Sequence, residues 1–332
     1  MRRALLSAIA TLAVACGRSE GVPDEQLGGL VIAPKTKAPP IDVARAGKDT
    51  KELGRALMLP YRDVITALGP HTYSISTSTV VEEAGKKVNE LSDQTSISLG
   101  DKGAFSAVYT NSADYGREAM WVDGKLFLRP RYQRWHGRAP EHPDEPNQIR
   151  DSFFVPIAAT WELLAPGAEL TDQGTVQVAG RTGKKIAVKL SPDPAKPQAE
   201  MLTQRKWREK RSIEAVSGEV VLDPDKGVPL SVKLSGTIVF TRDGRRFTMK
   251  VSLDASAREI GKAVAVAVPP PDQVVSTPER LREVDDRDFL LQGIAPPLRR
   301  NPDGTAVTPQ PKAAGSASLP PQVKDSGSNS DP

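Results

Sequence analysis

The sequence predicts an α+β fold built on one large, curved antiparallel sheet with helices packed against it. Apolar and polar residues alternate over most of residues 72–268, and this period of two is typical of half-buried strands. Asp-Gly pairs at 123–124 and 243–244 separate such runs, as in two-residue hairpin turns. Two other stretches, 49–68 and 151–164, carry apolar residues at helical spacing instead.

The first 15 residues are typical of a secretory signal. The basic start Met1-Arg2-Arg3 precedes an apolar run of 11 residues, Ala4 to Val14, which is too short to span a hydrocarbon core of about 30 Å. Leu12-Ala13-Val14-Ala15-Cys16 resembles the bacterial lipoprotein box. The resemblance implies that residues 1–15 are a lipoprotein signal peptide and that Cys16, the only cysteine, carries a diacylglycerol and an amide-linked acyl chain such as palmitate. The alternative is an ordinary signal peptide cut near Ala15, which would leave a free thiol.

Lipidation of Cys16 would determine where the protein resides. One acyl chain binds a membrane reversibly, whereas several on one residue hold a protein there stably. Gly17 follows the cysteine, and by the sorting rule of enteric bacteria the absence of Asp at this position implies the outer membrane. The expected location is therefore the cell envelope, with a membrane as the first partner.

Composition divides the mature chain into parts. Without the two arginines of the leader, 43 basic residues face 41 acidic ones, a balance that does not indicate nucleic-acid binding. Residues 16–47 are predicted to be a flexible tether and 48–268 a single domain. Residues 269–294 form an appendix with a short helix, which begins at a capping box, Ser276-Thr277-Pro278-Glu279. Residues 295–332 contain almost no large side chains, so a disordered tail is expected.

The first helix is predicted over residues 49–68. Its apolar side chains recur every three or four residues and form one stripe: Leu53, Leu57, Tyr61, Val64 and Leu68. Pro60 should kink or split it, and Gly69-Pro70 should end it.

Strands follow from Thr72. If Asp123-Gly124 is a hairpin loop, Trp121 faces Leu126 and Met120 faces Phe127, so both faces of this hairpin are apolar. One face can meet the core and the other needs a cover.

The candidate cover is a helix over 151–164. Asp151-Ser152 can cap it, although Pro156 in its early turns favours a start at Val155.

The clearest strand pair is the hairpin around Asp243-Gly244. Its expected register pairs Phe240 with Phe247 and Ile238 with Met249, which places the large apolar residues on one face. Gly236 then faces Val251. Glycine inside a long strand often marks a bend, so we expect the sheet to curl there. The alternative is a small residue beside a bulky neighbour.

Further strands are predicted at Ile186 to Leu190, with Lys185 and Lys189 outward, and at Val264 to Val268. The inner face of the sheet would be aliphatic and aromatic, and the outer face Ser, Thr, Lys and Arg.

Three segments resemble the half-barrel lipoprotein carriers of the LolA, LolB and LppX type. They are a glycine-led strand start at Val178 to Arg181, a strand–acidic turn–strand element at Val220 to Leu230, and a final strand at Val264 to Pro269. The resemblance implies a half-barrel whose concave face is covered by helices and binds lipid, acyl chains or lipoproteins.

The candidate ligand-binding residues are the apolar lining of the curled hairpin: Leu234, Ile238, Phe240, Phe247, Met249 and Val251. The alternative function is a surface-anchored structural or scaffolding module, in which the same residues are simply core. A cavity behind the sheet would favour the first function and a filled core the second.

No enzyme chemistry is predicted, because the sequence contains no nucleophile–base set, phosphate loop or standard metal spacing. No cofactor or metal is expected. His136 and His142 lie with Glu141, Asp144 and Glu145 in a Pro-rich stretch that is interpreted as an exposed polar loop. The basic cluster Arg205 to Arg211 around Trp207 either contacts anionic headgroups or another envelope polymer, or is a solvated connector with one buried Trp.

Overall fold

The computed structural model describes residues 39–196, 199–200 and 203–276. Cys16, the predicted helix after Ser276 and the predicted tail lie outside the described residues. The folded unit begins at Ile41. Within the described ranges, no helix has the length and apolarity needed to cross a bilayer.

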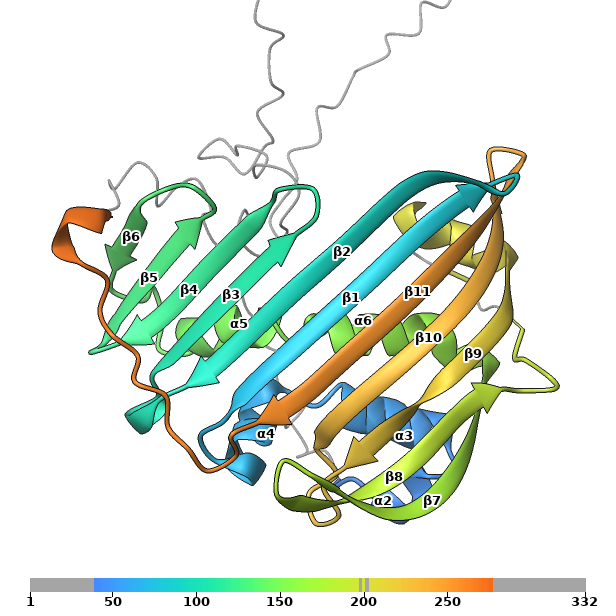
Figure 1. The fold of residues 1–332 in the computed structure, drawn as a ribbon, viewed down its shortest axis with the longest axis horizontal. Helices are drawn as coiled ribbons and strands as arrows, with labels where there is room; N and C mark the ends of the chain where they lie inside the picture. Colours follow the sequence, from blue (N-terminus) through green and yellow to red (C-terminus); the bar gives the residue numbers. More distant parts are fainter. Residues whose placement is uncertain (1–38, 197–198, 201–202, 277–332) are drawn as a thin grey trace, which may run out of the picture. The chain divides into compact units, whose positions relative to one another are not determined.

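Twelve strands of the described residues form one sheet (Figure 1). Their bounds are β1 Thr72–Glu83, β2 Lys86–Leu99, β3 Phe105–Asn111, β4 Gly116–Val122, β5 Lys125–Pro130, β6 Trp135–Arg138, β7 Ala168–Val178, β8 Arg181–Leu190, β9 Arg211–Leu222, β10 Pro229–Arg242, β11 Arg245–Arg258 and β12 Val274–Ser276. Their order is β12-β6-β5-β4-β3-β2-β1-β11-β10-β9-β8-β7. All neighbours are antiparallel except β12 and β6. The sheet curves strongly toward β7 without closing, so the predicted α+β half-barrel is confirmed.

The helices lie on the concave side of the sheet (Figure 1). They are α2 Val43–Ala46, α3 Thr50–Leu57, α4 Tyr61–Leu68, α5 Glu145–Ser152 and α6 Val155–Leu164, with 3-10 turns η1 Asp101–Gly103, η2 Ala165–Gly167, η3 Thr203–Lys210 and η4 Pro271–Gln273. The predicted helix over 49–68 is present and is split at Pro60 into α3 and α4. Helix α2 was not predicted; it lies within the segment assigned to the tether, and its Ala46 is fully buried.

The cap predicted at Asp151-Ser152 is wrong. Both residues end α5, and α6 begins at Val155, as the position of Pro156 had favoured. Proline is well tolerated in a first helical turn because the N–H it lacks has no intrahelical partner there.

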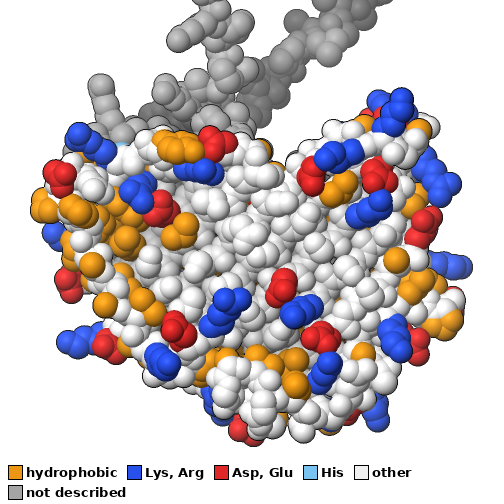
Figure 2. Space-filling view, viewed as in Figure 1, with side chains coloured by type: hydrophobic (Ala, Val, Ile, Leu, Met, Phe, Trp, Pro, Cys, Tyr) orange, Lys and Arg blue, Asp and Glu red, His pale blue; other side chains and the backbone are white. Residues whose placement is uncertain are grey.

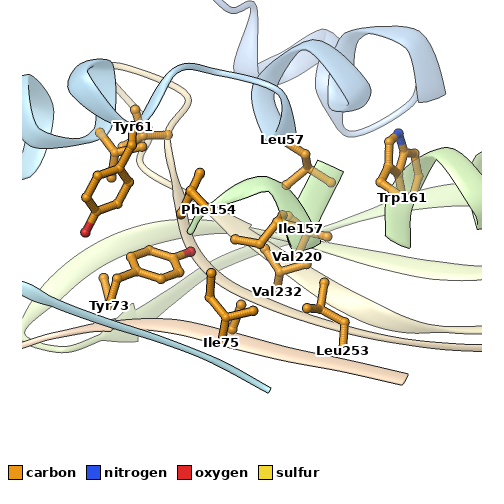
Figure 3. Packing of buried hydrophobic residues seen from close by; sticks show 14 of the residues in the cluster. Leu57, Tyr61, Tyr73, Ile75, Phe154, Ile157, Trp161, Val220, Val232 and Leu253 are labelled. Atoms are coloured by element: carbon orange, nitrogen blue, oxygen red, sulfur yellow. The ribbon is translucent and has the colours of Figure 1, made fainter. Parts of the chain in front are cut away.

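The core lies between α6 and the middle of the sheet. Helix α6 contacts β1, β10 and β11. In Figure 3, Ile157 lies over Ile75 and Val232, and all three are almost completely buried. On the outer face, charged side chains are scattered over a largely neutral surface (Figure 2), and many of them form cross-strand pairs such as Lys250–Glu82 at 2.7 Å.

Both predicted hairpin registers are confirmed. Phe240 faces Phe247, and Trp121 faces Leu126. Asp123 and Asp243, like the glycines that follow them, have positive φ, as a type I′ turn requires.

The second apolar face of the 121–126 hairpin is not covered by a helix. Val122, Phe127 and Trp135 form a separate small cluster, against which Val266 and Val274 of the C-terminal segment pack. The predicted strand at Val264 to Val268 is accordingly wrong.

The reason lies in the topology. Strand β11 has β1 and β10 on its two sides, so the chain has no free edge beside it. Residues 261–273 therefore cross the ends of the strands, and β12 adds in parallel to β6 (Figure 1).

One further prediction fails at the end of β8. Ile186 and Val188 are buried as expected, but Leu190 is exposed, since β8 ends there and the chain leaves the core.

Candidate functional site

Of the six residues predicted to line a ligand site, four lie in the packed interior and two at its margin. Leu234, Ile238, Met249 and Val251 belong to the buried core cluster, each at most 7% exposed. Phe240 and Phe247 are partly buried and stack with ring centroids 5.5 Å apart. Trp207 of η3 packs on Phe240 with ring centroids 4.7 Å apart, so the ring of Phe240 is covered by a side chain of the chain itself.

Gly236 explains how closely helix α6 approaches this surface. A Cβ atom at this position would lie 2.3 Å from Cδ2 of Leu164 and 2.9 Å from the carbonyl oxygen of Ala215. The glycine therefore makes room for a bulky neighbour, which is the alternative that the sequence had left open. Ligand contact with Leu234, Ile238 and Met249 would require α6 or η3 to move away, whereas Val251 borders a shallow hollow of about 320 Å³.

A cavity of about 580 Å³ lies elsewhere, between helices α3 and α6 and the connection from β8 to β9. Its apolar wall is formed by Gly54, Met58, Trp161, Ala165 and Pro166. Trp161 is 3% exposed and contributes the largest side chain, whereas Met58 is 67% exposed at the rim. The volume falls within the range of roughly 300–1,000 Å³ that small-molecule sites occupy.

The charged lining of this cavity is predominantly basic. The cations are Lys51, Arg55, Lys196, Arg208 and Arg211, against three carboxylates, Glu162, Asp193 and Glu200. Glu162 accepts a hydrogen bond from Arg208 at 2.7 Å and another from Arg205 at 2.9 Å. The carboxylate of Glu162 is thus already engaged by two guanidinium groups.

Arg211 lies at the start of β9 and borders a second cavity of about 200 Å³. The two cavities share four lining residues, Pro166, Ala195, Lys196 and Arg211. Burial, together with the nearby charge of Arg208, lowers the pKa of Arg211 from its ordinary value.

The Pro-rich stretch after β5 is not an exposed polar loop throughout. Glu145 is fully buried and receives two hydrogen bonds from Arg138, at 2.5 and 2.9 Å. His136 lies in β6. Burial of a bidentate ion pair fixes α5 against β6, and sequence spacing alone gave no sign of it. The described residues contain no group of three or more side chains suited to hold a metal ion.

The sequence signal that did point to the cavity is the basic cluster around Trp207. Part of it behaves as a connector, because Trp207 packs on the core and Arg205 pairs with Glu162. Arg208 and Arg211, however, reach the cavity. The rest of the lining comes from α3, α6 and the connection from β8 to β9. No pattern in the sequence predicts that these three segments lie together.

Comparison with solved structures gives matches at low sequence identity. A DUF1329 family protein from Desulfovibrio piger matches at 10% identity over 65% of this chain and 95% of its own, with a TM-score of 0.21. A putative outer membrane lipoprotein-sorting protein domain from Vibrio parahaemolyticus matches at 7% identity over 65% and 95%, with a TM-score of 0.20. A LolA superfamily protein from Nitrosomonas europaea matches at 7% identity over 64% and 96%, with a TM-score of 0.19.

No family model matches the chain, and neither does any curated protein. The TM-scores of the structural matches are all near 0.2. The function is therefore argued from the geometry of this chain.

Proposed function

We propose that this chain is a lipid-anchored protein of the cell envelope that binds a lipid or acyl chain. The observation that carries the proposal is the 580 Å³ cavity with its wall of Trp161, Met58, Ala165 and Pro166. An apolar wall of this kind gains free energy by covering an alkyl chain, about 0.8 kcal/mol for each buried methylene. Methionine at the rim suits chains of varied length because it is flexible and polarizable.

The ligand test is native mass spectrometry of the full chain purified from a bacterial host, with uptake of a fluorescent fatty-acid probe as a second measurement. We expect co-purified lipid and saturable uptake by the wild type. Ala168→Trp, which fills the cavity wall, should abolish both. Ala113→Trp, in an exposed turn between β3 and β4, is the matched control and should retain both. Neither lipid nor uptake in the wild type would contradict the carrier function.

A second candidate, a structural or scaffolding module, is favoured by one observation. The concave face under α6 is filled, and Leu164 occupies the space that Gly236 leaves. If the wild type binds no lipid, this module becomes the better account of the fold.

The anchor is tested separately. The proposed lipidation of Cys16 predicts that Cys16→Ser moves the protein from the membrane to the soluble fraction, since the acyl chains supply the attachment. Fractionation of cells expressing the variant measures this. Retention in the membrane pellet after a salt wash would show that another part of the chain holds it there.

A further inference from the structure

We propose that the 580 Å³ cavity selects amphiphiles with a compact anionic headgroup, a phosphate or a carboxylate, which Arg208 and Arg211 bind while the alkyl chain lies against Trp161 and Met58. The inference rests on the proposed function and names the class of ligand.

The first support is a pair of unsatisfied donors. Nε of Arg208 and Nη1 of Arg211 are buried and have no hydrogen-bond partner among the described residues. A buried charged donor without an acceptor is costly, and such groups in native proteins are usually partnered. Both arginines line the cavity, so an anion bound there can supply the missing acceptors.

The second support is the distribution of ion pairs. Arg208 pairs with Glu162 at 2.7 Å and lies 3.8 Å from Glu200. Arg211 is influenced by the charges of Glu200 and Glu162, but among the described residues no carboxylate lies close enough to form an ion pair with it. Its guanidinium group can therefore still take the oxygen atoms of a ligand.

The third support is the repulsion between the two arginines. Burial first, and then the charge of Arg208, disfavour the charged form of Arg211, and the carboxylates of Glu200 and Glu162 offset this only in part. An anion between the two guanidinium groups would reverse this effect. Guanidinium groups present planar sets of N–H donors that match the oxygen geometry of phosphate and carboxylate.

The apolar wall determines the other half of the ligand. Trp161 and Pro166 lie in the same cavity as the two arginines, so one ligand can contact both kinds of surface. A free anion would leave this apolar wall in water, whereas a neutral lipid would leave the arginine donors unsatisfied. A single-chain amphiphile with an anionic headgroup satisfies both.

The test compares two ligands that differ only in their headgroup. The full chain is titrated with 1-oleoyl lysophosphatidate and with 1-oleoylglycerol, and displacement of a fluorescent, uncharged monoacylglycerol probe, whose binding does not depend on the arginines, is measured. Charge-assisted hydrogen bonds should make the phosphate ligand bind tighter by about tenfold or more. Inorganic phosphate alone forms the third arm and should not displace the probe at the same concentrations.

Substitutions of Arg211 test whether this residue causes the preference for the phosphate headgroup. Arg211→Met removes the charge but keeps a long apolar side chain, and it should abolish the preference for the phosphate ligand while 1-oleoylglycerol still binds. Arg211→Lys should retain part of it. Arg242→Met is the matched control, because Arg242 lies at the exposed tip of the β10–β11 hairpin and carries the same charge.

The outcomes are distinguishable. Equal binding of the two oleoyl ligands by the wild type would overturn the headgroup inference and leave the proposed function intact. Binding of neither would overturn both. Tight binding of inorganic phosphate without a contribution from the oleoyl chain would show an anion site and not an amphiphile site. If Arg211→Met does not fold, the comparison of the two oleoyl ligands on the wild-type protein still tests whether the cavity prefers an anionic headgroup.

Discussion

Two regions of the concave side contrast with each other. In the packed centre, helix α6 lies on β1, β10 and β11, and side chains fill the space between helix and sheet. At the open end, helix α3, the last turn of α6 and η3 surround the 580 Å³ cavity. The same helix closes one region and lines the other, so a packed core and a cavity lie side by side in one domain.

The polar groups of the two regions differ in the same way. In the packed centre, His71 is fully buried and both ring nitrogens have partners: Nδ1 donates to the carbonyl of Gly69 at 2.7 Å, and Nε2 accepts from the hydroxyl of Tyr61 at 2.9 Å. At the open end, Arg208 and Arg211 have buried donors without partners in the described residues. Nδ1 of His136 in β6 also lacks a partner in the described residues, so the cavity is distinguished by two unsatisfied cationic donors side by side in one lining.

The largest expected effect is a difference in the free energy of unfolding between variants of the packed centre and variants of the cavity rim. Leu164→Ala removes a fully buried side chain of the packed centre and should lower the free energy of unfolding by about 2–5 kcal/mol. Met58→Ala at the rim of the cavity should change it by less than about 0.5 kcal/mol, because Met58 is 67% exposed. Urea unfolding of both variants measures the difference. Similar losses for the two would remove the distinction between the regions.

Most of the packed centre could be predicted from the sequence because strand alternation and hairpin turns are local signals. Asp243-Gly244 fixes the register of β10 and β11, and Pro60 fixes the break between α3 and α4. The open end depends on contacts between distant segments, such as Gly54 of α3 with Trp161 of α6, and no periodicity encodes these. The same holds for the Arg138–Glu145 pair and for the path of residues 261–273 across the strand ends.

Gly236 provides the next largest effect. Gly236→Ala should cost about 1–3 kcal/mol of stability, since the added methyl group overlaps Leu164. In the double variant with Leu164→Ala, the overlap with the leucine is relieved and only the 2.9 Å contact with the carbonyl oxygen of Ala215 remains, so the two costs should add only in part. Gly47→Ala is the control: its Cβ would meet its nearest neighbours at 3.5 Å, an ordinary contact, and its φ is −70°. Additive costs in the double variant would mean that Gly236 is required for sheet curvature and not for the approach of α6.

Met249→Gln tests whether the predicted lining belongs to the core or to the binding site. Met249 is 7% exposed, so the amide should be buried without partners and cost about 1–3 kcal/mol of stability. Uptake of the fatty-acid probe by the folded fraction should stay at the wild-type level, because Met249 does not line the 580 Å³ cavity. A normal melting curve with a severalfold loss of uptake would place the ligand against the curled hairpin instead.

The smallest expected effect is a pH dependence of the packed centre. Burial lowers the pKa of His71 below its ordinary value of 6.5, so the folded chain holds this ring neutral where the unfolded chain begins to protonate it. The stabilisation is complete above about pH 6.5 and decreases as the pH falls below it, by at most about 1.4 kcal/mol per pH unit for one proton. His71→Gln should remove this slope between about pH 6.5 and 5, even though it lowers stability at every pH. His142→Gln leaves His71 in place and should keep the wild-type slope. Urea unfolding at half-unit pH steps measures all three proteins, and an unchanged slope in His71→Gln would assign the pH dependence to other groups.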